Sequence, residues 1–126
     1  MIEAFHKKID VLLQQIVDDS RWDLESETLF VVTGMTFYGY CLGQKIVFML
    51  EQEDVNKAVV ERLVALGAGQ KYTEGLVEAA EQAFFKNEET LYNQLINIGH
   101  NYFMMDDLTE LVDNIYLNTK AILKQR

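Results

Sequence analysis

The chain contains no proline in 126 residues and only 7 glycines. Proline interrupts a helix at a cost of about 3 kcal/mol, so its absence leaves long helices free to form. The single cysteine, Cys41, has no partner for an internal disulfide, which is typical of a reducing compartment. The first residues carry charges within their apolar pattern and no small-residue cleavage site, so we do not expect a signal peptide. We therefore predict a cytoplasmic protein.

Basic residues are also scarce, because 11 lysines and arginines stand against 20 acidic residues and give a formal net charge of −9. This charge repels phosphate backbones and anionic lipid, so nucleic acid and the membrane surface are poor partners and a basic protein is a better one. Hydrophobic residues make up 49% and charged residues 25%, as in ordinary globular domains. A chain of this length can fold without a metal or a disulfide. We expect a single domain over residues 1–126.

Apolar residues recur at three- and four-residue spacing along most of the chain, and no stretch alternates long enough to make a strand. This pattern predicts an all-α bundle of five to six antiparallel helices joined by short connections. We expect a first helix near the N-terminus and a second over about 26–51, capped by Asp23 or Ser26. Asp54 should cap the third helix and Thr73 the fourth. Glu88 and Glu89 should open the fifth, and Asp106 or Asp107 should start the last.

The predicted second helix contains VVTGMTFYGYCLGQK, residues 31–45, in which apolar side chains cover nearly the whole circumference. Only Thr33, Tyr40 and Gln44 form a narrow polar seam on it. A membrane span is disfavoured, because Gln44 and Lys45 lie near the middle of the longer apolar run and no basic residues flank that run. We expect instead a central helix that is buried on several sides.

Three glycines lie inside this predicted helix and together cost about 3 kcal/mol relative to alanine. Close packing offsets that cost when the missing side chains let a neighbouring backbone approach. We therefore predict helix–helix close packing at Gly39 and Gly43. The neighbour belongs either to this chain or, in a homodimer, to a second copy. Self-association through this face characterises one alternative function, that of a helical regulatory or scaffold protein.

Side chains for catalysis or metal binding are few. Two histidines are too few for a three-histidine metal centre, and no Glu-x-x-His motif is present. His100 shortly precedes Asp106 and Asp107, so a small ligand- or metal-binding enzyme using His100 is the most distant alternative. The glycine-rich stretch GAGQKYTEG, residues 67–75, lacks the Gly-Lys-Ser or Gly-Lys-Thr ending of a phosphate-binding loop. We predict no enzyme, no cofactor and no metal.

Acidic residues gather at two of the predicted connections. Asp18, Asp19, Asp23, Glu25 and Glu27 crowd the first connection, and Glu51, Glu53 and Asp54 crowd the second. Acids collect at helix N-termini because the helix dipole favours them, which is one explanation for both groups. The other explanation is electrostatic steering of a basic protein partner. Tyr72 is a candidate aromatic anchor for such a partner, as are Tyr38 and Tyr40 if they are exposed.

The runs TGMTFYGYCLG, GAGQKYTEGL, YNQLINIGHNYF and NTKAIL resemble the small all-α immunity proteins of bacterial polymorphic toxin systems, in particular immunity protein family 48. The resemblance covers most of the chain from about Leu29 onward. It implies a cytoplasmic protein that binds a cognate toxin and neutralises it by occlusion. The shared motifs are helix-and-glycine patterns, so no toxin-contacting residue is carried over from the family.

Overall fold

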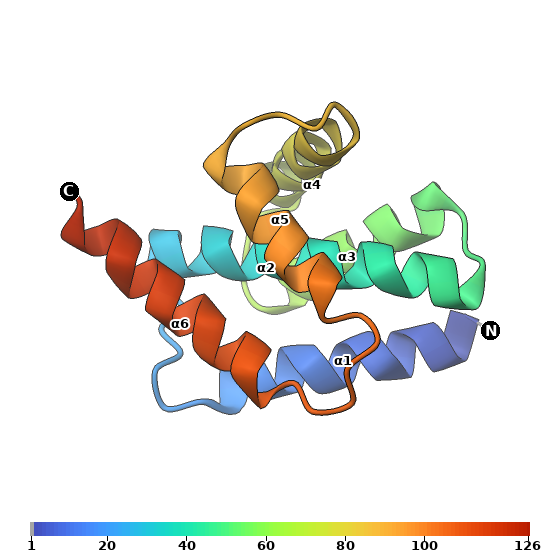
Figure 1. Ribbon diagram of the computed structural model, residues 1–126, viewed down its shortest axis with the longest axis horizontal. Coiled ribbons are helices and arrows are strands. Elements are labelled where there is room, and N and C mark those ends of the chain that lie inside the picture. The colour runs from blue at the N-terminus through green and yellow to red at the C-terminus, as the bar shows by residue number, and fades with distance from the viewer. Residues whose placement is uncertain (1) are drawn as a thin grey trace.

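A computed structural model describes residues 2–126, which form one helical domain without strands (Figure 1). The elements are α1 (Ile2–Asp18), α2 (Glu27–Phe48), α3 (Gln52–Ala65), α4 (Gln70–Phe85), α5 (Leu91–Asn101) and α6 (Thr109–Lys124). The predicted all-α fold class is confirmed. Within residues 2–126 no helix is both long enough and apolar enough to cross a membrane.

The central element is α2, which contacts each of the other helices. Its residues from Val32 to Gln44 are all buried, which explains why apolar side chains surround this helix. Figure 1 shows α1 running back along α2 in the opposite direction, whereas α5 crosses in front of α2. The short connections had led us to expect that all neighbouring helices are antiparallel. The crossing of α5 over α2 departs from that expectation.

The crossing of α2 and α5 depends on two glycines that each face the backbone of the other helix. A Cβ atom on Gly39 would lie 1.7 Å from a carbonyl oxygen of α5, and one on Gly99 would lie 1.8 Å from a carbonyl oxygen of α2. Only glycine allows the two backbones to come this close. At Gly43, a Cβ atom would lie 2.2 Å from the side chain of Phe103. The neighbour at Gly39 and Gly43 thus belongs to this chain, and the glycine face is closed to a second copy.

Four helices begin at residues other than those expected. The third helix begins at Gln52, before the predicted cap Asp54, and the fourth begins at Gln70, before the predicted cap Thr73. The fifth begins at Leu91, after the predicted Glu88 and Glu89, and the sixth begins at Thr109, after the predicted Asp106 or Asp107. Thr73 lies inside α4, where its hydroxyl donates to the carbonyl oxygen of Gly69 at 2.8 Å. Ser26 is the N-cap of α2, and its side chain accepts from the N–H of Leu29. A capping residue type therefore indicates a nearby helix start but does not fix its position.

Candidate protein-binding surface

Three of the five acidic residues at the first connection bind groups of this chain. Asp19 pairs with Arg21 at 2.9 Å, and Arg21 also pairs with Asp113 of α6 at 2.8 Å. Hydrogen bonds from the side chain and the backbone of Arg21 lower the pKa of Asp19 to about 2. The carboxylates of Asp18 and Asp23 each accept a hydrogen bond from a nearby residue. These three carboxylates are already engaged in local structure.

The other two acidic residues, Glu25 and Glu27, are exposed and share a groove with Tyr72. The groove has a volume of about 360 Å³ and lies where the α1–α2 connection meets the α3–α4 connection. Its lining comprises Leu24, Glu25, Glu27, Phe30, Gly67, Ala68 and Tyr72, which we call the Glu–Tyr groove. The fold therefore brings together three of the residues predicted to bind a partner.

Two aromatic rings lie beside one another in this lining. Phe30 is buried, whereas Tyr72 is 46% exposed, and their ring centroids are 6.3 Å apart with a tilt of 43°. Burial and the neighbouring carboxylate of Glu27 raise the pKa of Tyr72, so its phenol stays neutral. Gly67 turns the chain here with a φ of 116°, a conformation that favours glycine. The turn at Gly67 leads into α4, whose first turn carries Tyr72.

The charge of the Glu–Tyr groove is negative. Two carboxylates and no basic side chain are found among its seven lining residues. A cation is attracted both by a carboxylate and by the negative face of an aromatic ring, so the two groups together favour a guanidinium or an ammonium group. The groove is suited to receive the side chain of an arginine or a lysine from another molecule.

The second acidic group lies at the opposite end of α2. Glu51 is the N-cap of α3, and Glu53 and Asp54 lie in its first turn, where all three are exposed. At 1.5 Å per residue, the 22 residues of α2 separate this group from the groove by about 30 Å. The two acidic groups therefore do not form one continuous surface.

Tyr38 and Tyr40 are both buried in the core and are not available as anchors. Tyr38 donates a hydrogen bond to Asn56 of α3 at 2.8 Å. The polar seam of α2, formed by Thr33, Tyr40 and Gln44, is buried as well. The side-chain oxygens of these residues and the hydroxyl of Thr36, which is also buried, have no hydrogen-bond partner among the described residues. Burial raises the pKa of Tyr40 to about 12.

Among residues 2–126, His100 makes no side-chain hydrogen bond or ion pair with the two aspartates that follow it. Its ring lies between those of Phe84 and Phe103, with centroids 5.6 Å from each, and burial lowers its pKa. Asp106 and Asp107 are exposed, and Asp107 accepts the N–H of a residue at the start of α6. No cluster of three His, Cys, Asp or Glu side chains suited to a metal ion occurs in residues 2–126. We find no support for an acid–base or metal site at His100.

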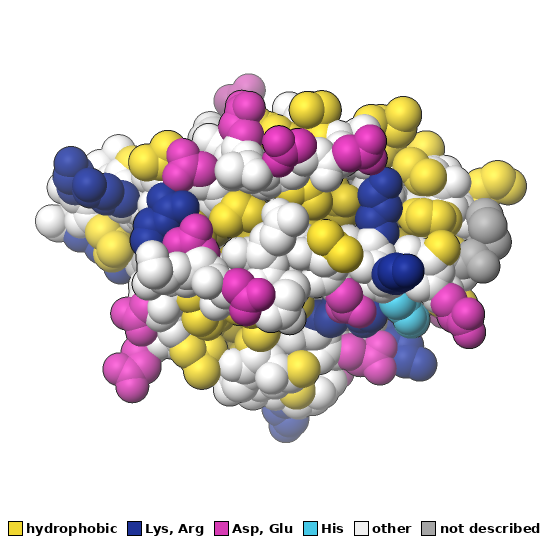
Figure 2. Space-filling view, turned by 90° about the horizontal axis from the view of Figure 1, so that it is seen from below, with side chains coloured by type: hydrophobic (Ala, Val, Ile, Leu, Met, Phe, Trp, Pro, Cys, Tyr) yellow, Lys and Arg dark blue, Asp and Glu magenta, His cyan; other side chains and the backbone are white. Residues whose placement is uncertain are grey.

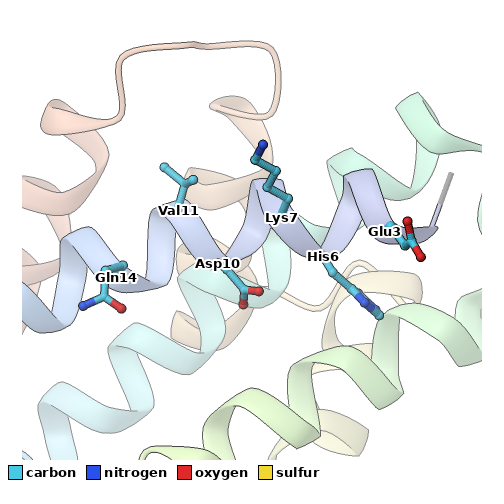
Figure 3. A pocket seen from close by; sticks show the side chains of 6 residues that line it. All are labelled: Glu3, His6, Lys7, Asp10, Val11 and Gln14. Carbon is cyan, nitrogen blue, oxygen red and sulfur yellow. The ribbon is translucent and has the colours of Figure 1, made fainter.

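A broad hollow of about 600 Å³ lies over α1, but its six lining side chains all come from that one helix (Figure 3). Val11 and Lys7 point away from His6 and Asp10 in this view. Asp10 is paired with Arg62 of α3 at 2.8 Å. Diverging side chains on a single helix do not enclose a ligand, so we interpret this hollow as a solvated helix face.

Comparison of the chain with protein-family models, with curated proteins and with solved structures finds no match. The resemblance to immunity protein family 48 therefore stays an expectation from the sequence motifs. On the surface of this chain, the Glu–Tyr groove is the place where predicted binding residues meet.

Sequence reasoning missed Leu24 and Phe30 as parts of the groove. Leu24 is an exposed apolar residue between Asp23 and Glu25 in the α1–α2 connection, so an apolar side chain between two acidic residues was a usable signal. Phe30 gave no such signal, because it belongs to the apolar pattern of α2. Its position beside Tyr72 depends on how α4 packs near the start of α2.

Proposed function

We propose that this protein is a non-enzymatic binding protein whose Glu–Tyr groove receives a basic side chain of a partner protein. One observation carries the proposal: Glu25 and Glu27 lie beside the exposed ring of Tyr72 in a groove without a basic residue. Tyrosine is among the residues that contribute most to the binding energy of interfaces. The net charge of −9 adds steering of a basic partner, which raises association rates roughly 10-fold to 1000-fold.

The partner that we propose is a basic bacterial toxin, which makes the chain an immunity protein. The resemblance to immunity protein family 48 supports this identity, and a compact acidic helical domain suits the role. The mechanism is steric occlusion: carboxylates attract the toxin, the groove binds one of its basic side chains, and the surrounding surface covers its functional residues. This mechanism requires no catalytic residue in the chain.

Rescue of bacterial growth tests this function, with the toxin encoded beside the gene for this chain as the partner. We expect the wild-type protein to restore growth and the variant Glu25→Gln, Glu27→Gln, Tyr72→Ala to lose the rescue. The matched control is Glu61→Gln with Glu78→Gln, which removes two charges from exposed positions of α3 and α4 outside the groove. Circular dichroism of each variant shows whether the fold is retained.

Rescue by the folded groove variant at the wild-type level would contradict a role for the groove. A gene neighbourhood without a toxin, together with failure of the wild-type protein to rescue, would contradict the immunity function itself. Equal loss of rescue in the groove variant and in the control would show that only the total charge matters.

A further inference from the structure

Met49 ends α2 in a backbone conformation that methionine rarely adopts. It is the C-cap of the helix, with φ 53° and ψ 49°, in the left-handed region where glycine or asparagine is usual. Its side chain is 82% exposed, the largest value among the exposed large hydrophobic side chains of residues 2–126. A glycine at this position would relieve backbone strain and remove an exposed apolar group. Nothing in the fold of the free protein requires methionine here.

Other exposed apolar side chains share this end of the molecule. Ile46 and Val47 precede Met49 on α2, Phe85 ends α4, and Met104 follows α5. Ile46 is 62% exposed and Met104 is 71% exposed. We call these five residues the end patch. Figure 2, which looks from below and so does not show the end of α4, has hydrophobic side chains at the upper right, toward the end of the molecule where α2 stops, with Lys or Arg side chains beside them.

Packed aromatic rings connect the elements that carry the end patch. Phe85 packs edge-on against Phe84, with centroids 5.2 Å apart. The ring of His100 lies between Phe84 and Phe103, 5.6 Å from each. Phe103 in turn packs closely on the C-terminal half of α2. The ends of α2, α4 and α5 therefore form one packed unit, which presents the end patch on a rigid support.

The end patch has an acidic border. Its neighbours along the chain include five carboxylates and two lysines: Glu51, Glu53, Asp54, Asp106, Asp107, Lys45 and Lys86. The Nζ atom of Lys45 donates to Gln52 at 3.2 Å and lies 5.9 Å from the centre of the Phe85 ring. The first turns of α1 also lie at this end, where Phe5 packs on Phe48, and they add Glu3, Lys7 and Lys8. Carboxylates therefore outnumber lysines in these segments by six to four. Two such borders repel each other in a dimer of this chain, whereas a basic border is attracted.

We propose that the end patch is a docking surface for an amphipathic helix with basic flanking residues, contributed by a partner protein. Exposed apolar side chains gathered at one place mark interaction surfaces, and methionine adapts its flexible side chain to the apolar face of a helix. The end patch lies about 30 Å from the Glu–Tyr groove, at the other end of α2. It is a second surface, and the inference does not rest on the function proposed for the groove.

Fluorescence anisotropy with a labelled amphipathic peptide of leucine and lysine, about five helical turns long, tests this proposal. We expect the wild-type protein to bind it and Met49→Gly with Phe85→Ser to bind it about 10-fold more weakly. Met49→Gly alone should weaken binding while raising the melting temperature, because it relieves the positive φ; this result separates docking from loss of the fold. The matched control is Val11→Ser with Leu117→Ser, which removes exposed apolar side chains of α1 and α6 outside the patch and should leave the affinity unchanged.

Equal affinities of the wild-type protein and the patch variant would overturn the proposal, as would equal binding of a peptide of leucine and glutamate. Sedimentation velocity should show a monomer, and a dimer that Met49→Gly dissociates would assign the patch to a second copy instead. Vesicles of anionic lipid should not bind, and binding that Met49→Gly abolishes would assign the patch to a membrane. The groove variant Glu25→Gln, Glu27→Gln should bind the peptide normally, so failure of this proposal is distinct from failure of the groove.

Discussion

Two neighbouring tyrosines of α2 show how differently buried hydroxyl groups are placed. The hydroxyl of Tyr38 donates to Asn56 at 2.8 Å and accepts from Gln52 at 2.9 Å. The hydroxyl of Tyr40 has no partner within residues 2–126. A buried hydroxyl without a hydrogen bond costs about 1–3 kcal/mol, whereas a satisfied one contributes about 1 kcal/mol to stability.

We expect Tyr40→Phe to leave the free energy of unfolding unchanged or to raise it by about 1 kcal/mol, because it removes an unpaired buried oxygen. Tyr38→Phe should lower the same free energy by about 1–2 kcal/mol, because it removes the two hydrogen bonds that the Tyr38 hydroxyl makes with Asn56 and Gln52. Urea denaturation measures both, and each variant serves as the control for the other. If Tyr40→Phe destabilises the fold as much as Tyr38→Phe, the Tyr40 hydroxyl must have a partner, such as a buried water.

Among the helices, the crossing of α2 and α5 is the contact that glycine makes possible. The sequence of α2 indicated that Gly39 and Gly43 need a close neighbour, but a glycine pattern on one helix does not specify which helix fills it. Gly99 is the reciprocal residue on α5, and in the sequence it lies within an ordinary apolar stripe. The pairing of Gly39 with α5 depends on the path of the chain over more than fifty intervening residues, which local periodicity does not encode.

Gly39→Ala should lower the free energy of unfolding by about 3 kcal/mol or more, because the new Cβ would lie 1.7 Å from a carbonyl oxygen of α5. The control is Gly75→Ala in α4, where no atom outside the helix backbone lies within 4 Å of a new Cβ. That substitution should stabilise the protein by about 0.5–1 kcal/mol, since alanine is the better helix former. Chemical denaturation compares the two, and a neutral effect of Gly39→Ala would mean that α2 and α5 lie farther apart.

Over the whole molecule, sequence reasoning fixed the fold class and some of the surface chemistry but not the surface shape. The apolar periodicity and the absence of proline were sufficient to predict an all-α domain. Glu25, Glu27 and Tyr72 were named from charge and residue type alone, yet their meeting in one groove depends on two connections about forty residues apart. Asp19 belonged to the same predicted group, but it pairs with Arg21, which also binds Asp113. Arg21 and Asp113 are 92 positions apart in the chain, so local sequence does not reveal this network.

The molecule as a whole presents two chemically different surfaces on one rigid helix. The Glu–Tyr groove lies near the start of α2 and is acidic and aromatic, whereas the end patch lies at its C-terminal end and is apolar with an acidic border. Because α2 is buried between Val32 and Gln44 and contacts every other helix, it holds the two surfaces at a fixed separation. The central claim is that the groove, and not acidic surface in general, selects a basic side chain.

Nuclear magnetic resonance titration of the isotope-labelled protein with a tetra-arginine peptide tests that claim most directly. We expect chemical-shift changes centred on residues 24–30 and 67–72, which contain the groove lining, and their loss in Glu25→Gln, Glu27→Gln, Tyr72→Ala. The changes should also weaken as salt is raised above about 0.15 M, where charges are screened within about 8 Å. Changes centred instead on Glu51, Glu53 and Asp54, or spread evenly over every acidic segment, would contradict the claim.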